Sequence, residues 1–246
     1  MSEYSRANYG ATTLDMSADA GLRKFMLGVY NKLGLGLVLS GILAYLTSAY
    51  PPVRDAMFNI QDGYLVGYTL LGNIVRFAPL VMIFGSMFVM KNPSAAAANL
   101  LYWAMVATIG AGLGVWLLVY TGESVAQTFF ITSAAFFGLS LFGYTTKRNL
   151  QAFGSFLIMA VIGLILAMVV NMFLKSGMMA MIISGIGVLI FSGLIAYDTQ
   201  RLKLQYYQLG GDQRSMAVAT SMGALSLYIN FINLFQFLLM LLGNRR

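Results

Sequence analysis

The sequence contains no histidine and no cysteine, and only 9% of its 246 residues are charged. The lack of cysteine excludes disulfides, thiolate nucleophiles and thiolate metal ligands. The lack of histidine removes the commonest proton shuttle and metal ligand. Together these absences exclude Ser-His-Asp hydrolases, cysteine nucleophiles and HExxH zinc sites, and no GxxxxGK[ST] phosphate-binding sequence occurs. We therefore expect no enzymatic activity and no cofactor.

What the chain has instead is apolar sequence, which makes up 59% of its residues against a usual share of about 45–50%. A chain this apolar and this poor in charge is typical of an integral membrane protein. The net charge of +7 requires no nucleic-acid partner, because membrane proteins gather Lys and Arg in their cytoplasmic loops. Lipid is the partner that the composition predicts.

Seven apolar stretches approach the roughly 20 residues that a helix needs to cross a bilayer. Pro51 and Pro52 end the first stretch, and the charged segment 53–77 is expected to be a long loop with some interfacial helix. Residues 1–24 are expected to form a polar tail, and residues 25–246 a single all-α domain. The predicted spans cover residues 30–50, 78–90, 95–120, 124–144, 150–174, 177–202 and 222–242.

Basic residues in the predicted loops favour a cytoplasmic N-terminus and an external C-terminus. With that orientation nine basic residues face the cytoplasm and five face outward, while Lys32 lies early in the first span and can reach toward the cytoplasm. The inner set is Arg6, Arg23, Lys24, Lys91, Lys147, Arg148, Arg201, Lys203 and Arg214. The outer set is Arg54, Arg76, Lys175, Arg245 and Arg246.

One acidic side chain, Asp198, stands near the end of the sixth predicted span. Burying an acid in a bilayer costs up to about 3 kcal/mol at the centre and less near an interface, so such a residue is a functional candidate. A local ion pair with Arg201 at i+3 is the structural alternative. Glu123 is a weaker candidate, because an acid at a helix N-terminus is favoured by the helix dipole.

The last span carries polar side chains on one helical face, at three- and four-residue steps. Lipid cannot satisfy these groups, so this face must meet protein or water and the helix must be deeply buried. Interhelical hydrogen bonding alone is an equally good explanation. A pair of glycines, Gly110 and Gly114, also predicts close helix packing in the third span. The polar face consists of Gly223, Ser226, Asn230 and Asn233.

Several stretches of the chain together resemble the transmembrane Bax inhibitor motif family, in its Bax inhibitor-one branch. The two most specific are IAYDTQ at residues 195–200 and LSLYINFINLF at residues 225–235. Two others are YTGES at 120–124 with Thr128 and Phe129, and GYTTKR at 143–148. The resemblance covers the chain from about the first span to its end.

The resemblance implies a seven-helix bundle in which two layers of three helices surround the last helix. It also implies a bacterial inner-membrane protein with a calcium-permeable leak, controlled by protonation of two aspartates. The first aspartate matches Asp198, but the second position holds Asn230, which removes the like-charge coupling of a carboxylate pair. In some family members a basic residue at the end of the second helix supports the aspartate, and Lys91 is the nearest match.

These observations lead to one main interpretation and two alternatives. The main one is a pH-sensitive calcium or cation leak with Asp198 as the cation-attracting group, Asn230 as its partner, and Arg201 and Lys203 beside the cytoplasmic mouth. The resemblance also implies a non-conducting regulator in stress protection, whose N-terminal tail engages a membrane-anchored ATP-dependent protease. The third is a scaffold in which Asp198 merely pairs with Arg201.

Overall fold

The computed structural model describes residues 19–246 and is almost entirely helical. Seven helices of the described chain are long and apolar enough to cross a membrane, which confirms the predicted all-α polytopic fold. The fourth predicted span, at residues 124–144, is reproduced almost residue for residue by α6. The long helices are α1 (Ala20–Ala49), α3 (Leu70–Val89), α4 (Ala95–Gly112), α6 (Gly122–Thr145), α7 (Gln151–Leu174), α8 (Gly177–Gln208) and α9 (Gln213–Leu242).

Capping side chains set where these helices begin. Asp19 accepts hydrogen bonds from the backbone N–H groups of Gly21 and Leu22, so α1 starts at Ala20, ten residues before the predicted span. Residues 20–24, expected to belong to the tail, are therefore helical. The rest of the predicted tail, up to residue 18, lies outside the described residues. Asp212 caps α9 in the same way, and this helix begins nine residues before the predicted one.

The segment 53–77 was expected to be a long loop, and this expectation is wrong for most of it. Pro51 and Pro52 end α1 but also begin a short helix, α2 (Pro51–Met57), where a missing N–H costs nothing. An antiparallel hairpin of β1 (Phe58–Gln61) and β2 (Tyr64–Tyr68) follows. Its turn residues, Asp62 and Gly63, both have positive φ, as an Asp-Gly hairpin turn requires.

The second predicted span, at 78–90, is too short, because α3 already begins at Leu70 after the capping residue Thr69. Arg76 therefore lies inside the helix. Its guanidinium sits 4.9 Å from the centre of the Tyr68 ring, which gives this charge an aromatic partner near the end of the span. Arg76, expected in the loop before the second span, is thus accommodated within α3.

The third predicted span, at 95–120, is confirmed as one candidate span, Ala95–Val119. Its helix is interrupted inside the span, because α4 ends at Gly112 and a short helix, α5 (Gly114–Val119), continues after Leu113. The predicted close packing of the two glycines is confirmed on either side of this break. A Cβ at Gly110 would lie 2.7 Å from the Ser40 Cα of α1, and a Cβ at Gly114 would collide with the Thr47 hydroxyl. Only glycine allows α1 and the α4–α5 segment to approach this closely.

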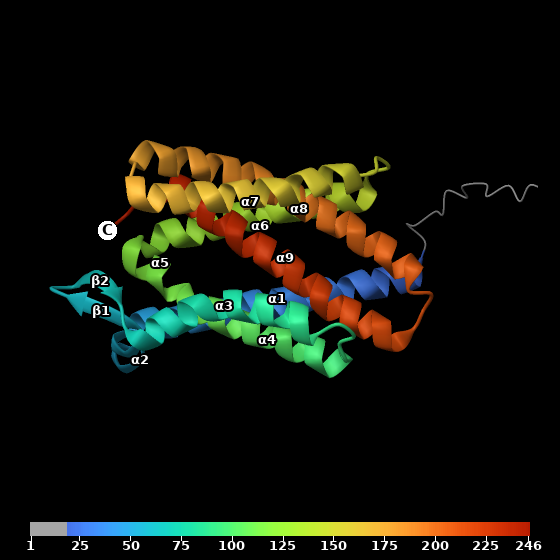
Figure 1. The fold of residues 1–246 in the computed structure, drawn as a ribbon, viewed down its shortest axis with the longest axis horizontal. Coiled ribbons are helices and arrows are strands. Elements are labelled where there is room, and N and C mark those ends of the chain that lie inside the picture. Colours follow the sequence, from blue (N-terminus) through green and yellow to red (C-terminus); the bar gives the residue numbers. More distant parts are fainter. Residues whose placement is uncertain (1–18) are drawn as a thin grey trace, which may run out of the picture.

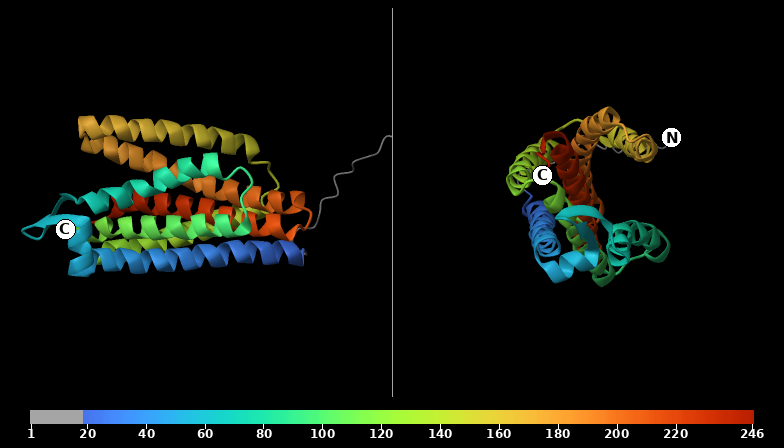
Figure 2. Two further views of the ribbon diagram at one scale, coloured as in Figure 1. Left: turned by 60° about the horizontal axis from the view of Figure 1, so that its bottom comes forward. Right: turned by 90° about the vertical axis from the view of Figure 1, so that its left-hand side faces the viewer.

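The helices form two layers with α9 between them (Figure 1), as the resemblance implies. One layer holds α1, α3 and α4, and the other holds α6, α7 and α8; α9 crosses obliquely between them and packs against α1, α4, α6 and α8. More than half of the apolar window of α9 is buried, whereas almost all of α3 and α7 faces outward. Figure 2 shows α3 and α7 at the edges of their layers.

Candidate functional site

The α8 helix carries Asp198 to the contact with α9, about 31 Å along the helix axis from Gly177. A bilayer hydrocarbon core is about 30 Å thick, so an α8 that enters the core at Gly177 and runs along the membrane normal carries Asp198 close to the opposite boundary between hydrocarbon and headgroups. Even so, Asp198 is only 4% exposed. The protein therefore shields a carboxylate from both lipid and water, and every polar contact of that carboxylate matters.

Three side chains satisfy this carboxylate. Oδ2 of Asp198 accepts hydrogen bonds from the Ser226 hydroxyl at 2.5 Å and from the Asn230 amide at 2.7 Å, both on α9. Oδ1 lies 2.9 Å from Nη2 of Arg201, one turn later on α8. We call these four residues the Asp198 cluster. The expected ion pair and the expected contact with the last helix thus occur together.

The charges of the Asp198 cluster balance, but its two ions differ in exposure. Asp198 lies inside the bundle, whereas the side chain of Arg201 is 44% exposed and packs over the Tyr197 ring at 5.6 Å. The same guanidinium also lies 3.4 Å from the Ser226 hydroxyl. Arg201 therefore closes the cluster on its solvent side, and the two α9 side chains close it on the other.

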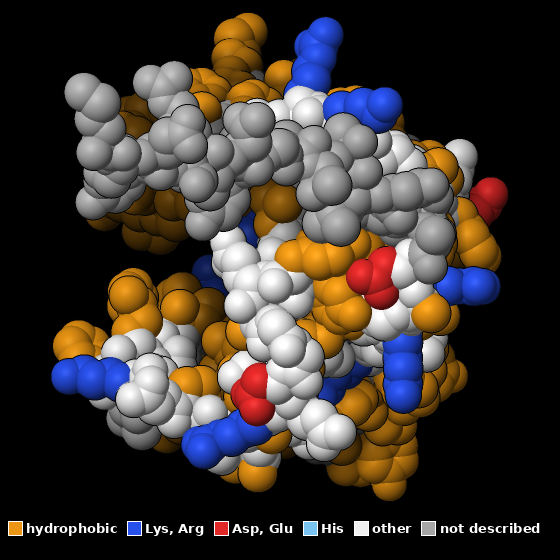
Figure 3. Space-filling view, turned by 90° about the vertical axis from the view of Figure 1, so that its right-hand side faces the viewer, with side chains coloured by type: hydrophobic (Ala, Val, Ile, Leu, Met, Phe, Trp, Pro, Cys, Tyr) orange, Lys and Arg blue, Asp and Glu red, His pale blue; other side chains and the backbone are white. Residues whose placement is uncertain are grey.

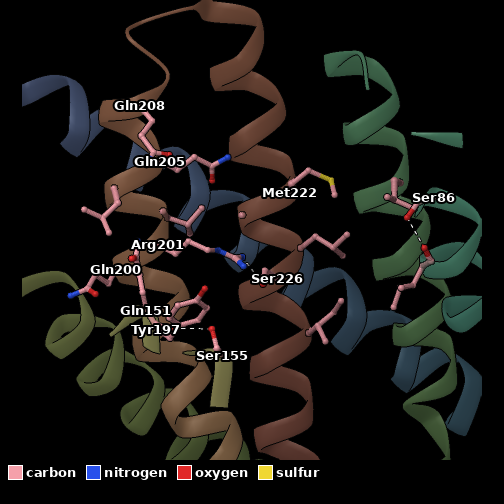
Figure 4. A pocket seen from close by; sticks show the side chains of 17 residues that line it. Ser86, Gln151, Ser155, Tyr197, Gln200, Arg201, Gln205, Gln208, Met222 and Ser226 are labelled. Carbon is pink, nitrogen blue, oxygen red and sulfur yellow. Dashed lines mark hydrogen bonds between the residues drawn. The ribbon is translucent and has the colours of Figure 1, made fainter. Parts of the chain in front are cut away.

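Beyond Arg201 the molecule has a cleft of about 730 Å³, bounded by α3 and α4 on one side and by α7 and α8 on the other, with α9 as its floor. We call it the α3–α7 cleft. Its polar wall, along α7 and α8, carries Gln151, Ser155, Arg201, Gln205 and Gln208 beside Tyr197, Gln200, Leu202 and Leu204 (Figure 4). Its mainly apolar wall, along α3, α4 and α9, carries Ile83, Leu101, Met222, Leu225 and Ile229 beside Ser86, Gly223 and Ser226.

Asp198 is not part of the cleft lining, whereas Arg201 and Ser226 are. In Figure 4 the Arg201 side chain extends from α8 toward Ser226 on α9. Figure 3, a view from the end where α8 leads into α9, shows a hollow at the left of the molecule with hydrophobic side chains along its lower margin. The cleft thus leads inward to the Asp198 cluster and stops at Arg201.

The other predicted site residues lie away from this cluster. Asn233 donates to the Ile229 carbonyl of its own helix rather than across to α8. Glu123 lies in the first turn of α6, beside the Thr121 backbone that pairs with Asn244 near the C-terminus, at the far end of the bundle. These two residues do not take part in the cluster.

Lys91, proposed as the basic residue that supports the aspartate, lies in the exposed connection between α3 and α4. Among the described residues it forms no hydrogen bond or ion pair with Asp198, whose basic partner is Arg201. The supporting charge therefore comes from the same helix as the acid. An i+3 spacing could be identified in the sequence, whereas the position of a loop lysine depends on tertiary packing.

Two polar residues of α8 have partners that the sequence did not reveal. Lys203, expected at the cytoplasmic mouth, is instead buried, and its ammonium donates to the Tyr144 carbonyl at the end of α6. Gln200 accepts from the Leu150 N–H and donates to the Arg148 carbonyl, both at 2.8 Å, which ties α8 to the α6–α7 connection. In the sequence, the i, i+3 spacing of Gln200 and Lys203 indicates only that both side chains lie on one face of the helix.

A second polar contact holds α9 to the opposite layer. The Lys32 ammonium of α1 donates to Asn99 on α4 and to Ser221 on α9, at 2.5 and 2.7 Å. Farther along, the Ser40 and Tyr228 hydroxyls are 2.6 Å apart. Polar contacts on both sides of α9 therefore fix its position between the layers.

Known sequences are similar to this one along nearly the whole chain. A family model described as "Inhibitor of apoptosis-promoting Bax1" matches residues 22–246. A protein of Caulobacter vibrioides is 64% identical over 236 residues, covering 96% of this chain and 94% of that protein. One from Rickettsia prowazekii is 41% identical, covering 96% and 95%. The inner membrane protein YbhL of Escherichia coli is 38% identical, covering 92% and 94%.

Proposed function

Because this chain belongs to the Bax inhibitor-one family of integral membrane proteins, we propose that it is a multi-pass inner-membrane protein and a slow leak for calcium or other cations. The observation that carries the proposal is the Asp198 carboxylate at the inner end of the α3–α7 cleft. A buried carboxylate just behind the cleft attracts cations, and one cation, the Arg201 guanidinium, already lies against it. No catalytic step is part of this proposal.

Two features support a closed state. The tethered guanidinium of Arg201 occupies the position from which a free cation would reach Oδ1 of Asp198. Beyond the cluster, aromatic rings fill the contact between α6 and α9: the Phe231 ring lies 5.7 Å from that of Phe129 and 5.5 Å from that of Phe136. Conduction would require Arg201 to leave Asp198 and α9 to shift against these rings.

A leak of this kind must bind its cations weakly, because each ion has to leave as readily as it arrives. A single carboxylate provides such weak binding. Within residues 19–246 no three acidic side chains gather into a site that could hold a metal ion firmly. Asp198 would therefore attract a passing cation without storing it.

The test uses two substitutions with opposite expected effects on calcium flux into liposomes that contain the purified protein. Arg201→Gln should raise the flux, because it frees the carboxylate, and Asp198→Asn should lower it, because it removes the attracting charge. The double variant should behave like Asp198→Asn. Arg214→Gln, which removes an exposed charge of the first turn of α9, is the matched control. Equal flux in Asp198→Asn and wild type would contradict the mechanism.

Acid should lower the calcium flux, as the Asp198→Asn substitution does. Protonation of Asp198 removes the negative charge, so the flux should fall as the pH falls. The groups that contact the carboxylate are Arg201 of α8 and the neutral side chains of Ser226 and Asn230 on α9. No second carboxylate faces Asp198 among them, so the like-charge coupling of a carboxylate pair is absent. A flux that rises in acid would contradict this mechanism.

A second candidate function is the non-conducting regulator that binds a membrane-anchored ATP-dependent protease. The observation that favours it is that all three partners of Asp198 are in place, which also suits a static connection between α8 and α9. Deleting residues 1–18 leaves the Asp19 cap of α1 intact and separates the two candidates. Loss of protease binding with unchanged flux supports the regulator, and loss of flux with retained binding excludes it.

A further inference from the structure

The α3–α7 cleft opens sideways toward lipid, since α3 and α7 are the helices with the least buried surface in their layers. From the geometry of this cleft we infer that it binds the phosphate headgroup of an anionic phospholipid, with Arg201 as the main contact. The inference rests on the cleft rather than on the proposed leak, and binding can be measured without any flux.

The level of Arg201 in the membrane fits a headgroup. Arg201 lies about 36 Å along the axis of α8 from Gly177, whereas the hydrocarbon core is about 30 Å thick. If α8 enters the core near its first residue, Arg201 lies just beyond the opposite boundary, where lipid phosphates are found. A lipid can therefore place its phosphate beside the guanidinium while its chains remain in the core.

The polar wall of the cleft provides further donors. Gln205 and Gln208 follow Arg201 at i+4 and i+7, so the three lie on one face of α8 (Figure 4). Within the described part of the chain, the side-chain amides of Gln151, Gln205 and Gln208 have no hydrogen-bond partner. These amides are therefore available for the oxygens of a headgroup.

The start of α7 adds a smaller contribution. This helix begins at Gln151, a lining residue, and its N-cap, Leu150, has no side-chain cap. The Gln151 N–H already donates to Asn149 Oδ1, so the contribution comes from the positive end of the helix dipole, which favours an anion there. Arg201 remains the principal contact, because a guanidinium can donate two parallel hydrogen bonds to a phosphate.

The apolar wall fits the rest of a lipid molecule. Ile83 on α3, Leu101 on α4 and Ile229 on α9 face the polar wall across the cleft. An acyl chain lying along these side chains would pass between α3 and α7 into the bilayer. A free phosphate would use the polar wall alone, so this second wall favours a lipid as the source of the phosphate.

Binding of the headgroup must compete with Asp198, which already holds the guanidinium at 2.9 Å. This competition predicts whether a substitution at Asp198 strengthens or weakens lipid binding. Asp198→Asn releases Arg201 and should strengthen the binding of an anionic lipid, although Asp198 is not in the cleft wall. A lipid bound at some other basic surface would be unaffected by this substitution.

The experiment is native mass spectrometry of the full-length protein in detergent, with phosphatidylglycerol and phosphatidylcholine of the same acyl chains. We expect the wild type to retain phosphatidylglycerol preferentially and Arg201→Gln to weaken that retention roughly ten- to a hundredfold. Asp198→Asn should increase the retention, and Arg214→Gln, outside the cleft, should leave it unchanged.

Three results would overturn the inference. They are equal retention of the two lipids, a preference that survives Arg201→Gln, and displacement of the lipid by inorganic phosphate alone. If Arg201→Gln does not fold, Leu101→Trp serves instead, because it fills the apolar wall and leaves the Asp198–Arg201 pair in place. Unchanged phosphatidylglycerol retention in Leu101→Trp would also overturn the inference.

Discussion

Removing Arg201 should destabilise the protein more than removing Asp198, although both changes break the same ion pair. The reason is the unequal exposure of the two side chains. Arg201→Gln leaves a carboxylate that is 4% exposed without its counter-charge, whereas Asp198→Asn leaves a guanidinium that is already 44% exposed and can turn toward water. The free energy of unfolding should reflect which ion is left behind.

The contacts allow rough magnitudes for both variants. Removing one partner of a buried pair costs about 3–5 kcal/mol, and the remaining bonds from Ser226 and Asn230 reduce this to about 2–4 kcal/mol. In Asp198→Asn the new amide oxygen still accepts both bonds, each weaker by about 1 kcal/mol. Because the buried charge is also gone, the net change should stay within about 1 kcal/mol.

The assay is unfolding of the purified protein in mixed micelles, for both single variants and the double variant. The double variant should be more stable than Arg201→Gln, because Asp198→Asn removes the uncompensated charge. A double variant no more stable than Arg201→Gln would refute the reasoning. So would an Asp198→Asn variant that loses as much stability as Arg201→Gln.

Three further predictions follow from other contacts. Asn230→Asp places a second carboxylate beside Asp198, so the pair should share a proton in mild acid and lose stability as the pH rises; a flat pH profile of unfolding would contradict this. Gly110→Ala should cost about 1–3 kcal/mol in the same assay, whereas Gly112→Ala, with open space at its Cβ, should be nearly neutral. Tyr228→Phe removes a buried interhelical hydrogen bond and should cost about 1 kcal/mol, seen as a lower melting temperature.

The sequence predicts the number and order of the membrane spans well, and the first and last residues of the helices less well. Apolar runs between charges and prolines identify the seven spans, because lipid admits few other sequences. The errors occur where local signals override hydropathy. The Asp62-Gly63 turn specifies a hairpin inside an expected loop, and Thr69 caps a helix that contains Arg76.

The sequence identifies those site residues whose polar side chains are costly to bury in a membrane. Lipid cannot satisfy Asp198 and Asn230, which makes both residues candidates from sequence alone, and their side chains lie 2.7 Å apart in the structure. Spacing along one helix also indicated Arg201. By contrast, Lys203 and its carbonyl acceptor are brought together by the packing of α6 on α8, which no pattern within a single helix encodes.

Asn230 stands where the family resemblance implies a second aspartate, and this amide changes how the Asp198 cluster can be released. Two carboxylates repel one another and are held together by a shared proton, so losing that proton is sufficient to separate them. Here Asp198 is held by a guanidinium and two neutral donors, and the cluster is neutral as built. If the leak and the lipid site are as proposed, a cation competes for Asp198 and a phosphate in the cleft competes for Arg201, so both act on the Asp198–Arg201 pair of α8.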